Sequence, residues 1–166
     1  MFKRKKKLKK YKRIEEVIIK HLDGGLQETA LKFVAYLNEN QLTPNMADSG
    51  YIPFNGHNLG WMRVEGKNKW LFEIFDFLHF GDFSDDDEEF RKAVHDHVGI
   101  CDAPCHDECW RAKDVKIFGK EFKSVCSQHS RAFENPDGKT IEHIKKLIEY
   151  SKKTVPYEQQ YHPNNL

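Results

Sequence analysis

The spacing of apolar residues predicts two short helices near the start of the chain. Between residues 14 and 22 apolar side chains stand three or four positions apart, and Asp23-Gly24-Gly25 ends the run. This spacing places them on one face of a helix, and glycine accepts the positive φ with which many helices end. A second stripe from 26 to 37 ends before Pro44, so we expect a second packing helix there.

Between Tyr51 and Phe80 the pattern changes to that of strands. Asn55-Gly56 separates two strand-like runs, and Asn-Gly is the strongest short hairpin signal because both central residues of the turn need positive φ. Gly66-Lys67-Asn68 marks a second turn. The stretch predicts a three-stranded antiparallel meander. Its last strand, residues 69–80, is apolar on both faces, which predicts a central, covered position.

Two acidic residues, Glu73 and Asp76, interrupt this last strand. A carboxylate among aromatic residues can have a raised pKa and act as an acid or base. No histidine, serine or cysteine is tied to either residue by a motif, so we expect the commoner arrangement, in which both point to solvent at the end of the sheet.

The second half of the chain predicts two further helices around short strands. Ser84 is expected to cap the first, which has an acidic first turn and a buried stripe that includes Phe90 and His97. Short strands are expected at three places, followed by a last helix with Asn135 as its cap, Pro136 at its first position and a buried apolar face. The strands are residues 115–118, 121–126 and 131–133, and the apolar face of the helix spans 141–148.

Together these elements predict a single α+β domain over residues 14–153. We expect a mainly antiparallel sheet, two N-terminal helices, a cysteine-rich loop and a packed C-terminal helix. A chain of 166 residues with 39% hydrophobic and 13% aromatic residues has enough apolar material for one core. Residues 154–166 read as a polar tail.

A basic arm precedes this domain. Residues 3–13 carry nine of the 27 lysines and arginines and no acidic residue, although the net charge of the whole chain is only +1. Such an arm suits contact with nucleic acid or an anionic surface. The alternative is a solvated, flexible terminus over residues 1–13.

The cellular compartment affects how the cysteines are interpreted. The apolar run Val17-Ile18-Ile19 ends at Lys20, which is too short for the apolar core of a signal peptide, and the sequence offers no transmembrane span. We therefore expect a cytoplasmic protein. Thiols stay reduced there, which favours metal binding, free thiols or redox chemistry over structural disulfides.

All four cysteines lie within one stretch, and their spacing suggests a zinc site. They are Cys101, Cys105, Cys109 and Cys126. Cysteines four apart can share one helix face, and a fourth from a strand would complete a tetrahedron of four thiolates around a structural Zn²⁺. His97, expected on the same helix side as Cys101, and His106 are alternative ligands, as is His95. Buried reduced thiols, or a disulfide or redox pair, remain alternatives.

Two further hypotheses concern function. The first is a non-enzymatic intracellular binding or sensing domain, in which aromatic residues of the predicted sheet line a pocket for a small molecule or protein. Its candidate residues are Trp61, Trp70, Phe72, Phe75 and Phe77, and the alternative is that they fill the core. The second is a thiol-dependent redox or transfer enzyme that uses Cys105 and Cys109, with His106 lowering a thiol pKa.

The chain resembles a family of small bacterial proteins that share a cysteine-rich loop. The residues that carry the resemblance are Ile117-Phe-Gly-Lys-Glu-Phe-Lys-Ser-Val-Cys126 and Phe133-Glu-Asn-Pro-Asp137, with Phe33-Val-Ala-Tyr-Leu37 upstream. The resemblance covers about residues 26–153 and carries no activity or catalytic residue with it. The order of elements also looks like that of small ligand-binding α+β domains, some of which accompany DNA-binding domains, which is an analogy of fold alone.

Overall fold

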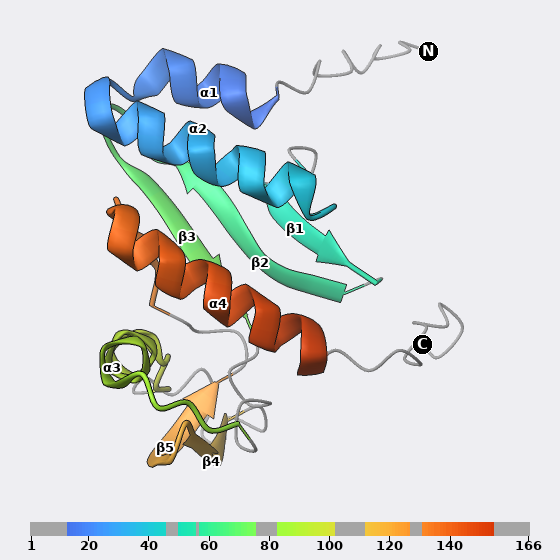
Figure 1. Ribbon diagram of the computed structural model, residues 1–166, viewed down its shortest axis with the longest axis vertical. Coiled ribbons are helices and arrows are strands. Elements are labelled where there is room, and N and C mark those ends of the chain that lie inside the picture. The colour runs from blue at the N-terminus through green and yellow to red at the C-terminus, as the bar shows by residue number, and fades with distance from the viewer. Residues whose placement is uncertain are drawn as a thin grey trace, which may run out of the picture.

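A computed structural model describes residues 13–45, 50–55, 57–75, 83–101, 112–126 and 131–154. These residues form four helices and six strands in antiparallel sheets, which confirms the predicted α+β class (Figure 1). In chain order the elements are α1 (Ile14–His21), α2 (Gly24–Glu39), β1 (Tyr51–Phe54), β2 (His57–Val64), β3 (Trp70–Ile74), α3 (Glu88–His97), β4 (Ala112–Ile117), β5 (Lys120–Cys126), β6 (Phe133–Glu134) and α4 (Gly138–Thr154).

The larger sheet has the strand order β1-β2-β3-β6, and β4 pairs with β5 in a separate hairpin. The first three strands form the meander that the sequence predicts. β3 lies between β2 and β6, and all five of its residues are buried, which confirms its central position. Figure 1 shows α2 and α4 lying across one face of this sheet, with α3, β4 and β5 grouped beyond α4.

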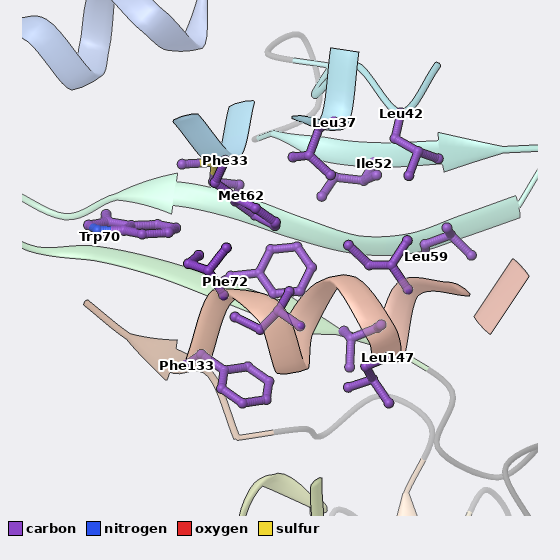
Figure 2. Close-up of a cluster of buried hydrophobic side chains, with 14 of the residues drawn as sticks. Phe33, Leu37, Leu42, Ile52, Leu59, Met62, Trp70, Phe72, Phe133 and Leu147 are labelled. Atoms are coloured by element: carbon purple, nitrogen blue, oxygen red, sulfur yellow. The ribbon is translucent and has the colours of Figure 1, made fainter. Parts of the chain in front are cut away.

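Alternation along the strands decides which side chains enter the core. Met62 lies opposite Phe72, and Val64 lies opposite Trp70, so these residues share one face of the sheet. Rings of Trp70 and Phe72 contact Phe33 of α2, with centroids 6.1 and 5.1 Å apart, which identifies that face as the one covered by helices. Figure 2 shows this cluster between the sheet, α2 and α4.

A β-bulge bends the middle of β2. Ile52 pairs with Gly60 and Pro53 with Asn58, which leaves Leu59 as an extra residue. Leu59 is buried in the core cluster. Gly60 is required here because a Cβ atom would lie only 2.1 Å from the backbone oxygen of Glu73 on β3. The bulge therefore brings one more apolar side chain into the core, next to the glycine that lets β2 approach β3.

The hairpin of β4 and β5 is tied to the helices by its turn. Ile117 pairs with Lys120, so Phe118 and Gly119 are the two turn residues, and both have positive φ, 43° and 86°. The Phe118 ring is buried, with its centroid 5.3 Å from that of Phe90 on α3 and 5.1 Å from that of Tyr150 on α4. The predicted strand 115–118 thus ends one residue early, because Phe118 turns into the core.

Two helix caps differ from the predictions. The side chain of Asp87, not Ser84, accepts a hydrogen bond from the backbone N–H of Phe90 at the start of α3. At the start of α4 the side chain of Asp137 accepts from Thr140 N–H, so Asn135 is not the cap. Both helices begin later than expected because a carboxylate two or three residues downstream makes the capping bond.

Asn135 has a different structural function, in the sheet. Its side-chain oxygen accepts from Trp70 N–H at 2.9 Å, and its side-chain amide donates to the backbone oxygen of Asn68 at 3.1 Å. Its own backbone N–H donates to Trp70 O at 2.9 Å. These bonds extend the short pairing of β6 with β3.

Candidate functional site

The backbone of Cys101 lies beside the end of β5, where Cys126 stands. Ile100 and Val125 form an antiparallel bridge, and Cys101 N–H donates to Ser124 O at 2.8 Å. On the other side of the strand Ala112 pairs with Cys126. The described chain therefore stops at Cys101 on one side of the end of β5 and resumes at Ala112 on the other. Cys105, His106 and Cys109 lie outside the described residues.

A β-bulge lies at this end of the hairpin and is held by hydrogen bonds to one carboxylate. Lys113 pairs with Val125 but Val115 pairs with Phe122, so β5 contains one extra residue, and Ser124 has a φ of +53°. The Asp114 carboxylate accepts from Lys123 Nζ at 2.7 Å and from Ser124 N–H at 3.0 Å. These two bonds, the lysine first, lower the pKa of Asp114. The strand next to Cys101 is thus held by a charged side chain that stays ionised.

His97 does not share a helix face with Cys101, which corrects the sequence-based expectation. Helix α3 ends at His97 and Val98 is extended, so Cys101 is not one helical turn further on. The His97 ring stacks on Phe133 at 3.7 Å between centroids, and its Nδ1 lies 2.7 Å from Ala93 O. Burial lowers its pKa. His97 therefore acts first as a packed core residue.

His95, the other candidate histidine of α3, is also used in packing. Its Nε2 lies 2.9 Å from the backbone oxygen of Ile117, and its ring contacts Phe122 at 5.3 Å. Burial lowers its pKa as well. Within the part of the chain that the structure describes, no three histidine, cysteine or acidic residues are grouped so that they could hold a metal ion.

The five predicted pocket aromatics do not lie together. Trp70 and Phe72 are fully buried and face α2, so they fill the core rather than line a pocket. Trp61 and Phe75 are only partly buried and lie on the opposite face of the sheet. Phe77 is outside the described residues, as is Asp76. We call the face that points away from α2 and α4 the far face.

On the described part of the far face, three aromatic rings form a cluster. Tyr51 lies opposite Trp61 on the neighbouring strand, and their rings are nearly parallel, with centroids 6.2 Å apart and planes at 19°. Phe75 lies 6.4 Å from Tyr51 and 6.1 Å from Trp61. Tyr51 is 37% exposed, so the cluster is open to solvent on at least one side. We call Tyr51, Trp61 and Phe75 the aromatic triad.

Among the described residues, Glu73 and Arg63 border the aromatic triad. Glu73 lies opposite Trp61, accepts a hydrogen bond from the indole Nε1–H and is 8% exposed, so it does not point to solvent as expected. The guanidinium carbon of Arg63 lies 4.3 Å from the centroid of the Trp61 ring, a cation–π contact. Arg63 Nε also lies 2.9 Å from Glu65.

Further ion pairs continue along the far face. Lys69 Nζ lies 3.7 Å from Glu65 and 3.2 Å from Glu134 of β6. These charges belong to β2, β3 and β6 or to the residues beside them, so they form a polar border along one side of the aromatic triad. The sequence analysis missed Tyr51 and Arg63 as parts of this site. For Arg63 the signal was the alternation that places it two residues from Trp61. For Tyr51 there was no local signal, because the turn at residues 55–56 alone would place Gly60 opposite it, and the bulge at Leu59 shifts its partner to Trp61.

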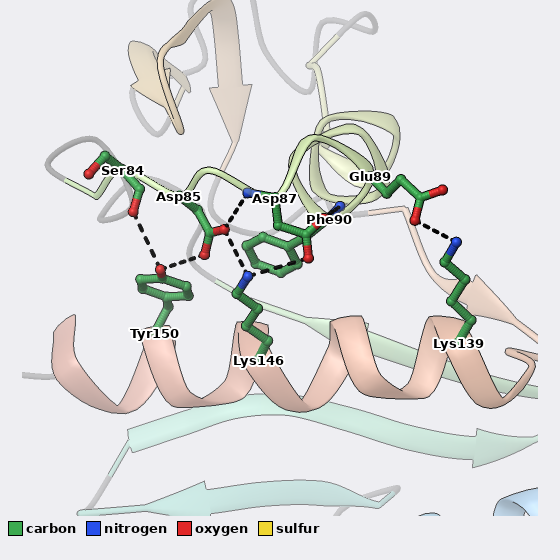
Figure 3. A network of polar contacts seen from close by, with 8 residues as sticks. All are labelled: Ser84, Asp85, Asp87, Glu89, Phe90, Lys139, Lys146 and Tyr150. Atoms are coloured by element: carbon green, nitrogen blue, oxygen red, sulfur yellow. Dashed lines mark hydrogen bonds and ion pairs between the residues drawn. The ribbon is translucent and has the colours of Figure 1, made fainter.

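A shallow groove of about 660 Å³ lies on the other side of the molecule, between α2, α4 and the start of α3. Its charged side chains are largely paired with one another: Glu89 with Lys139, Asp87 with Lys146, and Glu142 with Lys145. Figure 3 shows how Asp85, Asp87 and Glu89 meet Lys139, Lys146 and Tyr150 of α4. These contacts attach α3 to α4, so we interpret the groove as a helix junction.

No family model matches the chain, and no curated protein or solved structure matches it at a significant level. No helix in the described ranges is both long and apolar enough to cross a bilayer.

Proposed function

We propose that this protein is a non-enzymatic ligand-binding domain, and that it binds its ligand on the far face through the aromatic triad. The observation that carries the proposal is the partial exposure of three mutually contacting rings beside a buried carboxylate. Aromatic rings that stay accessible while their neighbours form a core are typical of binding surfaces. A few charged groups at their border then orient what binds.

The rest of the fold supports this use of the far face. The opposite face is packed against α2 and α4, so the strands that carry Tyr51, Trp61 and Phe75 are fixed from behind. Sites built on a packed sheet hold their side chains more precisely than sites on loops. The bulge at Leu59 lies just before Trp61 in β2, and bulges commonly re-aim side chains at functional sites.

A fragment screen followed by two-dimensional NMR tests the proposal. We expect hits to shift the indole N–H resonance of Trp61, and Tyr51→Ala to weaken them at least about fivefold, because one ring face is lost. Tyr36→Ala is the matched control, since Tyr36 is a partly exposed tyrosine on α2, away from the far face. Hits that leave Trp61 unchanged, or that respond equally to both substitutions, would contradict the proposal.

A structural zinc ion on Cys101, Cys105, Cys109 and Cys126 is a second proposal, with His97 and His106 as alternative ligands. The observation that favours it is the position of Cys101 beside β5 and of Ala112 opposite Cys126, which attaches both ends of the cysteine-bearing segment to one strand end. Thiolates are the ligands that structural zinc prefers. The packing of His97 on Phe133 makes the four-cysteine set the better one.

Elemental analysis of the protein purified without added metal tests the zinc proposal. We expect about one zinc per chain, loss of the metal in Cys101→Ser and Cys126→Ser, and a lower melting temperature with a chelator. Ser127→Ala, next to the last cysteine, is a control that keeps all four thiols. Four titratable thiols with no metal would leave reduced cysteines as the better account.

A further inference from the structure

The chain already places a cation on its own aromatic triad. The guanidinium carbon of Arg63 lies 4.3 Å from the Trp61 centroid, well within the roughly 6 Å over which a ring face attracts a cation. Tryptophan gives the strongest such attraction among the aromatic side chains. Arg63 is also partly exposed, at 40% for its side chain, and forms an ion pair with Glu65. The indole face of Trp61 is thus already used to hold positive charge.

The size of the aromatic triad suits a compact cation. The three centroids are 6.1 to 6.4 Å apart, so they form an almost equilateral triangle. An ammonium group about 4 Å above the centre of that triangle would lie about 5.4 Å from all three centroids, inside the cation–π range. The distances therefore allow one charged group to lie near all three rings, with the Phe75 ring tilted by 58° from Tyr51 and by 41° from Trp61.

The surrounding charges also complement a cation. Among the described residues, Glu73 is buried beside Trp61, and Glu65 and Glu134 lie along the same face in ion pairs with Arg63 and Lys69. An anionic ligand such as a phosphate or a nucleic-acid strand would lie close to these carboxylates. Glu73 already accepts the indole N–H, so it supplies negative charge beside the rings without needing a ligand donor.

We propose that the ligand of the far face is a quaternary or methylated ammonium group, bound over Tyr51, Trp61 and Phe75 with Arg63 as its internal competitor. This inference rests on the proposed function of the far face. Methylated ammonium groups carry few or no N–H donors, so apolar ring faces and a nearby carboxylate charge suffice to bind them. Arg63 holds the same kind of contact when the ligand is absent.

Choline and its uncharged carbon analogue, 3,3-dimethylbutan-1-ol, separate charge from shape. We expect choline to shift the Trp61 indole resonance in a saturable way, and the neutral analogue to bind about five- to thirtyfold more weakly, as loss of a cation–π contact of about 1–2 kcal/mol predicts. Tyr51→Ala should weaken choline binding at least about fivefold. Arg63→Ala should strengthen it about threefold or more, because the competing guanidinium is removed.

The outcomes distinguish this inference from the function on which it rests. Equal binding of choline and the alcohol, with Trp61 responding to both, would overturn the cation inference and leave the binding face standing. The same holds if neither binds while neutral screening hits still shift Trp61. Weaker choline binding by Arg63→Ala would also overturn it, since Arg63 would then be a partner of the ligand. No hit of any kind at Trp61 would reject both proposals.

Discussion

Trp61 and Glu73 lie directly opposite each other on β2 and β3, and the indole Nε1–H of Trp61 donates a hydrogen bond to the carboxylate of Glu73. The carboxylate is almost fully buried, so its charge depends on such bonds for solvation. This pair joins the aromatic and the charged parts of the far face. Its loss should lower both the stability of the protein and its affinity for a ligand.

Glu73→Ala should lower the free energy of unfolding by about 1–3 kcal/mol, because a partly buried indole N–H loses its acceptor. The summed emission of the three tryptophans should shift to the red as the Trp61 ring becomes more hydrated. Glu65→Ala is the control: Glu65 forms only partly exposed ion pairs, and its loss should cost no more than about 0.5 kcal/mol. Urea unfolding of both variants measures the difference, and equal midpoints would contradict the expectation.

Trp70 presents the opposite case to Trp61. It is fully buried, yet its Nε1 has no hydrogen-bond partner among the described residues. Trp70→Phe removes an unsatisfied donor whose burial costs about 1–3 kcal/mol, which offsets part of the lost packing. We therefore expect Trp70→Phe to destabilise the protein less than Trp61→Phe, although Trp70 is the more buried ring. Denaturant unfolding of the two variants decides the order, and the reverse order would mean that packing alone governs both sites.

At position 118 the glycine variant should be more stable than the alanine variant, which reverses the usual order. Its φ of +43° lies in the left-handed region, where a side chain costs about 1 kcal/mol and glycine does not. Both substitutions lose the contacts with Phe90 and Tyr150, which should cost about 3–5 kcal/mol. Phe118→Gly should nevertheless be more stable than Phe118→Ala by about 0.5–1 kcal/mol in thermal or urea unfolding. A less stable glycine variant would show that the turn relaxes when the ring is removed.

The contact between α3 and α4 should weaken in acid. Burial by itself raises the pKa of Asp85, but hydrogen bonds from Lys146, from Asp87 N–H and from Tyr150 outweigh it and lower that pKa (Figure 3). The unfolded chain then binds a proton before the folded one does. The stabilisation is present above about pH 4 and is lost as the pH falls below it. Asp85→Asn should reduce this loss in urea midpoints measured across the acid range, but not abolish it, because Asp87 also pairs with Lys146 and has a lowered pKa, chiefly through its hydrogen bond from Phe90 N–H. Asp86→Asn, at an exposed neighbour, should keep the full loss.

The contact between α3 and α4 should also weaken in strong base, because there the group that titrates is Tyr150, whose pKa is raised. The hydrogen bond with Asp85, followed by burial, raises the pKa of Tyr150 to about 12. A raised folded pKa gives stabilisation that is present below about pH 10, the unfolded value, and is lost as the pH rises toward 12. Phenolate absorbance of the folded protein should include a component that titrates near 12 and that decreases in Tyr150→Phe. Burial also raises the pKa of Tyr36 to about 12, so part of that component should remain.

Local sequence signals predicted the meander well because each of its turns has its own chemistry. Asn55 has a φ of +48° and Phe54 pairs with His57, as the Asn-Gly signal requires. Gly66 and Asn68 likewise have positive φ in the turn between β2 and β3. The all-apolar run of β3 predicted its central position for a physical reason: both of its faces are buried.

Features that depend on distant residues could not be predicted in this way. The pairing of β6 with β3 is extended by hydrogen bonds of Asn135, which the sequence presents as an ordinary helix cap. The environment of Glu73 depends on the register that brings Trp61 opposite it. His97 and Cys101 were expected on one helix face because the pattern does not reveal that α3 ends at His97. In each case the deciding contact or boundary depends on how other elements pack.

The position of the short strand β6 shows which part of the chain is inserted into the larger sheet. Leu71 and Phe72 of β3 pair with Glu134 and Phe133, so the chain leaves the sheet and returns to it in the adjacent position, antiparallel. Everything between these strands, including α3, β4, β5 and all four cysteines, is topologically an insertion between two neighbouring strands. A short hairpin could replace it without changing the strand order. The strand order of the larger sheet therefore does not depend on this insertion, whereas the core does, because Phe90 and Phe118 of the insertion pack against Tyr150 of α4.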